Sequence, residues 1–248
     1  MPNDSAPETD EPCPFCLKPR TLCVCAEIVP VANRIALLIL QHPQEQDKTL
    51  GTARLAVRQL GDATLRVGLS WPSLANALGR PADPQRWAVL YLGSAKAATL
   101  LPDREVVAIN GKGAPVPDQA AAFRAIEGII VLDGTWSQAK TLWWRNPWVL
   151  KCQRVILGPQ RPSRYGKLRY EPRGDSLSTL EAAALLLRHL EDRPEIETAL
   201  VSTFERLLGR YRLMLADPAV GVPAEHPAKR PDWRARSRGR RLRALPHR

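Results

Sequence analysis

Four residues of different chemistry follow one another at positions 133–136: an aspartate, a glycine, a threonine and a tryptophan. The apolar run before them, residues 128–132, has the length and β-branching of a buried strand, and residues 137–145 after them have helix-forming composition. Open α/β sheets bind ligands at such strand ends. Asp133 could therefore act as a base or anchor a ligand, and Gly134 could permit an unusual backbone angle or close ligand approach. The alternative is that Asp133 or Thr135 only caps the helix.

Four cysteines lie within thirteen residues, with the spacing C-x2-C-x6-C-x-C: Cys13, Cys16, Cys23 and Cys25. A reducing compartment disfavours disulfides, and closely spaced thiolates suit tetrahedral Zn²⁺. We expect a structural zinc knuckle over residues 13–30, closed to chemistry because four sulfur ligands leave no open position. A redox pair or unliganded thiols are the alternatives. Cys152 stands apart, and we expect a small buried side chain there.

Other polar segments are weaker candidates. His42–Glu45 and Tyr91–Ser94 each follow an apolar run, and the basic segment 161–169 could bind phosphate, although a solvated loop is its default interpretation. A Walker P-loop and a G-x-G-x-x-G motif are both absent from the sequence, so ordinary ATP or NAD chemistry has no support.

Alternating strands and helices must position these residues. We expect strands at residues 34–40, 87–92, 128–132 and 154–157, and at most a short strand at 64–68 in the irregular segment 61–86. We expect helices at residues 49–60, 118–126, 136–145, 178–190 and 194–215. The near-continuous apolar strands predict an α/β domain over residues 31–216, with a mainly parallel sheet flanked by helices.

Charge is concentrated at one end of the chain. The 248 residues carry a net charge of +11, and residues 229–248 hold nine Lys or Arg against one Asp. We expect residues 1–12 and the basic tail 217–248 to be flexible. The tail is either solubilising or a polyanion-binding arm, and Trp233 among arginines favours nucleic acid. No apolar run approaches the roughly 18 residues of a membrane span, and the polar N-terminus is no secretory signal, so we expect a cytoplasmic protein.

The residues Asp133–Trp136 resemble the signature that names the DTW-domain family. The resemblance extends over roughly residues 13–215 and includes the cysteine cluster, His42–Glu45, Thr49–Arg54, Gln138–Lys140 and Ser178–Ala183. The family is similar to tRNA-uridine aminocarboxypropyltransferases, which move the 3-amino-3-carboxypropyl group of S-adenosylmethionine to N3 of uridine. In bacterial members the resemblance implies uridine 47 of the tRNA variable loop. It also implies a SPOUT-like fold, with a knotted sheet that binds the cofactor in its loops.

The resemblance further implies roles for individual residues. Asp133 and Trp136 would be catalytic, with Asp133 either accepting the N3 proton or positioning a ligand. The cofactor would contact strand ends and a helix start: Leu92, Gly93, Ser94, Leu132, Gly134, Thr135, Ser178, Thr179 and Glu181. The tRNA would contact mainly basic side chains: His42, Lys140, Arg161, Arg164, Lys167 and Arg169. The segment 91–94 lacks the proline that is frequent in the family's cofactor loop.

The expected partners are S-adenosylmethionine, structural zinc and tRNA, with no membrane and no obligate protein partner evident. Two alternatives remain open. The protein could be a non-catalytic zinc-knuckle RNA-binding protein, or it could perform the same chemistry on ribosomal RNA.

Overall fold

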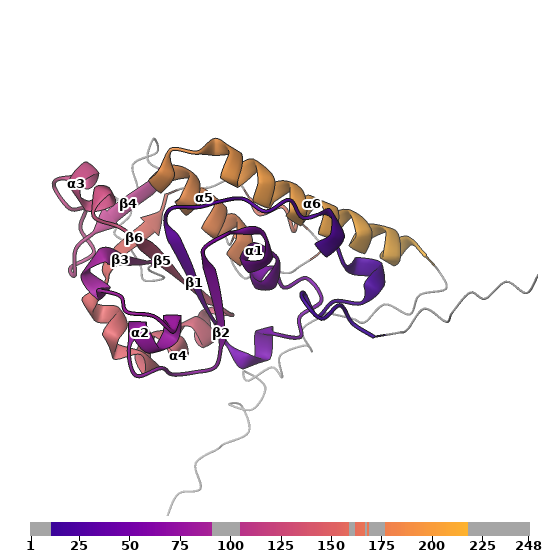
Figure 1. The fold of residues 1–248 in the computed structure, drawn as a ribbon, viewed down its shortest axis with the longest axis horizontal. Helices are drawn as coiled ribbons and strands as arrows, with labels where there is room; N and C mark the ends of the chain where they lie inside the picture. Colours follow the sequence, from indigo (N-terminus) through magenta and orange to yellow (C-terminus); the bar gives the residue numbers. More distant parts are fainter. Residues whose placement is uncertain (1–10, 91–104, 159–161, 167, 169–176, 218–248) are drawn as a thin grey trace, which may run out of the picture.

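One six-stranded sheet organises the part of the chain that the computed structural model describes, which is residues 11–90, 105–158, 162–166, 168 and 177–217 (Figure 1). The strand order is β2-β1-β5-β3-β6-β4. The strands are β1 (Ala36–Gln41), β2 (Ala63–Val67), β3 (Trp87–Leu90), β4 (Val106–Ile109), β5 (Gly128–Asp133) and β6 (Gln153–Leu157). All neighbours pair in parallel except β4, which runs antiparallel to β6 at the edge. The predicted mainly parallel α/β fold is therefore confirmed.

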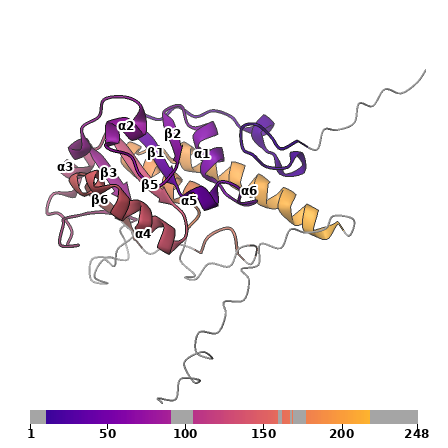
Figure 2. The same cartoon turned by 90° about the horizontal axis from the view of Figure 1, so that it is seen from below.

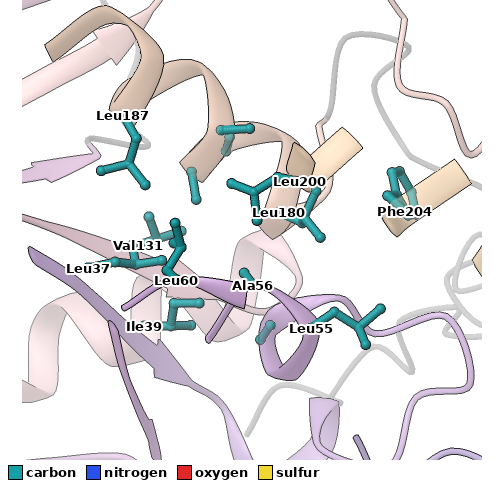
Figure 3. Close-up of a cluster of buried hydrophobic side chains, with 14 of the residues drawn as sticks. Leu37, Ile39, Leu55, Ala56, Leu60, Val131, Leu180, Leu187, Leu200 and Phe204 are labelled. Atoms are coloured by element: carbon teal, nitrogen blue, oxygen red, sulfur yellow. The ribbon is translucent and has the colours of Figure 1, made fainter. Parts of the chain in front are cut away.

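Helices cover both faces of this sheet and explain why its central strands are apolar throughout. The helices are α1 (Ala53–Gln59), α2 (Leu74–Leu78), α3 (Gln119–Arg124), α4 (Trp136–Arg145), α5 (Thr179–Glu191) and α6 (Pro194–Ala216). Leu37 and Ile39 of β1 face a core that they share with α1, α5 and α6 (Figure 3). The alternate residues Leu38 and Leu40 face a second core with α2 and α4. Successive side chains point to opposite faces, so every residue of β1 is buried.

The register of β1 and β5 places their last residues side by side. Leu37 pairs with Ile129, and four residues later Gln41 pairs with Asp133. Both side chains lie on the face that α5 covers, because they continue the alternation of Ile39 and Val131. A strand end, a neighbouring strand end and the start of α5 therefore converge at one edge of the sheet.

The structure differs from the expectations mainly in short elements. The predicted helix 49–60 begins only at Ala53, since Gly51 closes a turn with its N–H to the carbonyl of Lys48. The short strand expected at 64–68 exists as β2. Neither α2 nor β4 was predicted. The prediction that residues 91 and 92 extend β3 falls outside the described residues.

The N-terminal segment packs along α6 and α1, at the end of the molecule away from α3 (Figure 2). Leu22 and Val24 of this segment belong to the same core as Phe204 and Tyr211 of α6. The expected flexible ends at 1–12 and 217–248 lie almost entirely outside the described residues. The implied knot concerns connections that contain 91–104 and 169–176, which also lie outside them, and it stays a prediction. Among the described helices, none is long and apolar enough to cross a membrane.

Candidate active site at the carboxyl edge of the sheet

Asp133 is the last residue of β5, and hydrogen-bond donors from two other elements hold its carboxylate. Its Oδ2 accepts a hydrogen bond of 2.7 Å from Nε2 of Gln41, at the end of β1. Its Oδ1 accepts a hydrogen bond from the hydroxyl of Thr179, the first residue of α5. Two donors and a helix N-terminus make this an environment that suits a carboxylate anion. The carboxylate is thus placed by the sheet register and by α5.

Thr135, not Asp133, caps the helix that follows the turn. The Thr135 hydroxyl accepts a hydrogen bond from the backbone N–H of Gln138, and the Gln138 side chain accepts one from the Thr135 N–H at 2.6 Å. This reciprocal pair is a capping box, which satisfies two N–H groups at the start of α4. The helix-capping alternative therefore holds for Thr135 and fails for Asp133, whose side chain faces α5.

Gly134 is required by close packing within the protein. Its backbone does not have a positive φ, so the expectation of an unusual backbone angle is wrong. A Cβ atom at this position would lie 2.8 Å from Cβ of Gln138 and 3.4 Å from Cβ of His42. The first of these distances is far shorter than ordinary van der Waals contact. A side chain here would push the turn away from the first turn of α4.

Hydrogen bonds dock the sequence motifs onto one another. The N–H of His42 donates to the carbonyl of Asp133 at 2.9 Å, and Nε2 of Gln138 donates to Oε1 of Gln44 at 3.1 Å. The N–H of Leu180 donates to the Thr52 hydroxyl at 3.2 Å. Segments 41–45, 49–54, 133–140 and 178–183 therefore form one continuous site, assembled from parts of the chain that lie far apart in the sequence.

Glu181 anchors the loop at residues 162–166 to the start of α5. Its carboxylate is buried and accepts hydrogen bonds from the Ser163 hydroxyl at 2.6 Å and from the N–H of Arg164 at 2.9 Å. The same carboxylate accepts from the N–H of Ser178, which caps α5 in a second capping box. The structure thus gives the side chains of Ser178 and Glu181 a scaffolding role. Their contact with a cofactor stays a prediction.

Trp136 and Lys140 form an exposed surface on the first turns of α4. The Trp136 side chain begins α4 and is 42% exposed, and the Lys140 ammonium lies 5.5 Å from its ring centroid. A partly exposed indole next to a cation suits stacking on a nucleobase.

The other side chains predicted to contact RNA either bind groups within the protein or lie outside the described residues. Nδ1 of His42 accepts the N–H of Gln44 at 3.3 Å and so caps a 3-10 turn. The Arg164 guanidinium forms an ion pair with Glu205 at 3.0 Å. Six predicted contacts lie outside the described residues: Leu92, Gly93, Ser94, Arg161, Lys167 and Arg169.

The four N-terminal cysteines form a second site, remote from the carboxylate. Their Sγ atoms all lie within 4.8 Å of one another. Zn–S bonds of about 2.3 Å in a tetrahedron place sulfur atoms roughly 3.8 Å apart, so a small contraction would seat a dication. All four side chains are free thiols rather than disulfides. The donor set and its spacing fit a closed tetrahedral metal site.

Burial and backbone hydrogen bonds give these thiols unequal acidity. Burial raises the pKa of Cys16 to about 11. Burial also acts to raise the pKa of Cys13, but hydrogen bonds from the N–H groups of Cys16 and Phe15 outweigh it and lower that pKa to about 6. One thiol in this cluster ionises easily, but each further negative charge is strongly disfavoured. A bound cation is therefore needed for all four thiols to ionise. Cys152, by contrast, is buried in the second core, as expected, where burial raises its pKa to about 12.

The profile of the DTW domain matches residues 10–212, which is most of the chain. The chain belongs to the DTW family. Relatives include proteins named tRNA-uridine aminocarboxypropyltransferase 2 from Drosophila melanogaster, Macaca fascicularis and Mus musculus. The fly protein is 31% identical over 84% of this chain and 77% of its own length. The macaque and mouse proteins are 29% and 28% identical over 79% of this chain, which spans 61% of their length. No solved structure matches.

Gln41 is the site residue of this DTW protein that the sequence interpretation missed. Its side chain is 2% exposed, and Nε2 donates to Asp133, while Oε1 has no hydrogen-bond partner in the described part of the chain. A polar residue at the end of an otherwise apolar buried strand was the available signal. An unpaired buried acceptor is costly, and the donor that the same amide supplies to Asp133 explains why an amide stands here.

Replacing Gln41 by leucine is expected to lower the rate of the proposed transfer roughly tenfold to hundredfold, since a hydrogen bond to a charged group contributes about 1.5–3 kcal/mol. Thermal stability should change little, because the unpaired acceptor disappears with the donor. Single-turnover rates and melting temperatures would measure both effects.

The variant Gln41→Glu tests positioning through pH. When protonated, the carboxyl introduced at position 41 can donate to Asp133 as the amide does, whereas the ionised form repels Asp133, and the two carboxyls titrate as a coupled pair. The rate relative to the natural protein should therefore fall as pH rises. A ratio that does not change with pH would contradict the positioning role.

Proposed function

We propose that the protein transfers the 3-amino-3-carboxypropyl group of S-adenosylmethionine to N3 of a uridine in tRNA. The observation that carries the proposal is the Asp133 carboxylate, held by Gln41 and Thr179 at the edge of the sheet within the family's signature turn. The names of the fly, macaque and mouse relatives support the substrate and the transferred group.

The donor substrate supplies an electrophilic carbon, because its sulfonium is already a charged leaving group. A bond forms between uridine N3 and the γ-carbon of the arm, while the bond from that carbon to sulfur breaks and its electron pair leaves with neutral methylthioadenosine. The N3 proton goes to the Asp133 carboxylate and from there to solvent. Asp133 is suited to this because two donors fix its orientation but leave lone pairs on each oxygen.

Orientation supplies much of the remaining catalysis, since the leaving group needs no further activation. Trp136, exposed at the start of α4, would stack on the uridine ring, with Lys140 beside it. We propose that Leu132, Gly134 and Thr135 line the donor pocket together with 92–94 and the start of α5 at 178–181. The carboxylate of Glu181 would act there by holding the loop 162–166 in place.

The cysteine cluster would hold zinc and no reactants. Four thiolate ligands close the coordination sphere, and the cluster packs against the core of α1 and α6 rather than against Asp133. Its contribution is to fold the N-terminal segment. A cytoplasmic location, which we also propose, would keep these thiols reduced.

Mass spectrometry of nucleosides from tRNA and ribosomal RNA, purified separately from a strain that lacks the gene, tests the proposal. The aminocarboxypropyl uridine should disappear from tRNA and return when the natural gene is restored, but not when Asp133→Asn is supplied. Loss from ribosomal RNA alone would overturn the choice of substrate. Mapping the tRNA product tests the expected position, uridine 47.

Calorimetry with S-adenosylmethionine separates the enzyme from a non-catalytic RNA-binding protein. An enzyme of the proposed kind binds the donor in the absence of RNA or when RNA is added, whereas a pure binding module binds it in neither case.

A further inference from the structure

A basic cavity of about 470 Å³ opens at the sheet edge opposite Asp133. It lies where three neighbouring strands begin, because Arg34 precedes β1, Arg86 precedes β3 and Glu127 precedes β5. The charged residues that line it are Arg34, Arg80, Arg86, Arg124, Asp62 and Glu127. Apolar surface from Ala36, Trp87 and Ile126 completes the lining.

Charges in this cavity do not cancel. Arg80 pairs with Asp62 at 2.7 Å, and Arg86 pairs with Glu127 at 2.7 Å. Among the described residues, no carboxylate lies within ion-pair distance of Arg34 or Arg124. Within the described segments, the Arg34 guanidinium makes one hydrogen bond, a long one of 3.4 Å to the carbonyl of Leu190. Four arginines against two acids leave a net charge of +2 in a concave surface.

Surplus arginines beside apolar surface favour a ligand that joins an anionic group to an apolar or sugar-like part. Arginine matches phosphate oxygens geometrically and is weakly hydrated, so it exchanges water for phosphate at modest cost. The volume falls in the range of roughly 300–1,000 Å³ that accommodates small organic ligands, which exceeds the needs of a bare phosphate. A phosphate with its ribose fits both the charge and the size.

We propose that this cavity binds the phosphate–ribose backbone of the tRNA substrate, away from the nucleotide that is modified. The inference rests on the proposed function. A six-residue strand spans about 20 Å at roughly 3.3 Å per residue, so a single folded tRNA can contact both edges of the sheet. A tRNA accounts for the surplus positive charge better than a small ligand does, because each exposed guanidinium can contact a different phosphate of the RNA backbone. The cavity therefore adds affinity and orientation, and takes no part in the bond changes.

The test compares full-length variants in tRNA binding at several salt concentrations. The double variant Arg34→Gln/Arg124→Gln should bind tRNA at least about tenfold more weakly, and the slope of log affinity against log salt should shrink by roughly one to two, since each lost phosphate contact removes about 0.7–0.9. The rate at saturating tRNA and the affinity for S-adenosylmethionine should stay within about twofold. Both side chains are exposed, so the fold should survive.

The matched control removes the same charge at the far end of the molecule. Arg20 belongs to the N-terminal segment and Arg212 to the last turns of α6, and both are exposed. Figure 2 shows that segment and the end of α6 at the opposite end of the molecule from α3. The variant Arg20→Gln/Arg212→Gln should change the salt slope less than the cavity variant. Arg34→Lys/Arg124→Lys, which keeps both charges, should retain most of the slope.

Equal slopes for the cavity variant and the control, or no loss of affinity in the cavity variant, would overturn the inference. Failure of the proposed function gives a different result. A protein that binds tRNA but transfers no group contradicts the enzyme, and the comparison of slopes still decides whether the cavity contacts RNA.

Discussion

Asp133→Asn is expected to slow single-turnover transfer by roughly 10² or more while the protein stays folded. Asparagine has nearly the same size, and its Oδ1 can still accept the Thr179 hydroxyl. Its Nδ2 would face Nε2 of Gln41, but a half-turn of the Gln41 amide presents the unpaired Oε1 instead. The hydrogen bonds can therefore be rebuilt, and only the anion that accepts the N3 proton is lost.

The measurement combines transfer from saturating S-adenosylmethionine to tRNA with thermal melting of each variant. Asp118→Ala is the control, because it removes the side chain that caps α3, away from the proposed site, and should cost about 1 kcal/mol of stability with a small effect on rate. If Asp133→Asn transferred at the natural rate, Asp133 would have no part in the proton transfer. The turn would then contribute only shape and backbone groups.

Zinc removal is expected to have the largest effect on stability. Structural zinc sites contribute apparent binding free energies of about 10–16 kcal/mol at neutral pH, and that energy is folding energy for the segment that holds the ligands. Purified protein should contain about one zinc per chain. A strong chelator should lower the melting temperature and expose the N-terminal segment to protease, since the hydrogen bonds described within residues 13–28 close only short turns.

Cys16→Ala should reproduce the effect of the chelator, with zinc content falling well below one per chain. Cys152→Ala is the control, because it also shortens a buried cysteine but lies in the other core and should keep the metal. A natural protein with no bound metal, and a melting curve that chelator leaves unchanged, would show that the four thiols have another role.

The spacing of apolar residues in the sequence predicted the long helices and strands but not the shortest ones. Helix α4 occupies the predicted residues 136–145, because a capping threonine and a proline fix its two ends. Strand β4 has four residues and α2 has five, too few for either period to emerge. The antiparallel pairing of β4 with β6 follows from tertiary packing and leaves no mark on the local pattern.

The sequence could predict which residues belong to the candidate site, but not the hydrogen bonds between them. The strand end pointed to Asp133 and Thr135 from the residues themselves, and the family resemblance added Ser178. Nothing local could reveal that Thr135 caps α4 while Asp133 turns toward α5, since both residue types cap helices. The hydrogen bond between Gln41 and Asp133 depends on the register of two strands that lie far apart in the chain.

The short segment 49–52 contacts three separate parts of the chain, and these contacts limit where the protein can be cut or joined to a relative. The carbonyl of Thr49 accepts the buried Lys18 ammonium at 2.7 Å, and the carbonyl of Leu50 accepts the Tyr165 hydroxyl at 2.7 Å. Thr52 holds the start of α5, next to the residue that donates to Asp133. Residues 49–52 therefore connect the cysteine-bearing N-terminal segment to the helix that contacts the carboxyl edge of the sheet. A chimera that takes its first thirty residues from a distant relative would need matching changes at 49–52, and a protein cut between them would not yield an independent catalytic fragment.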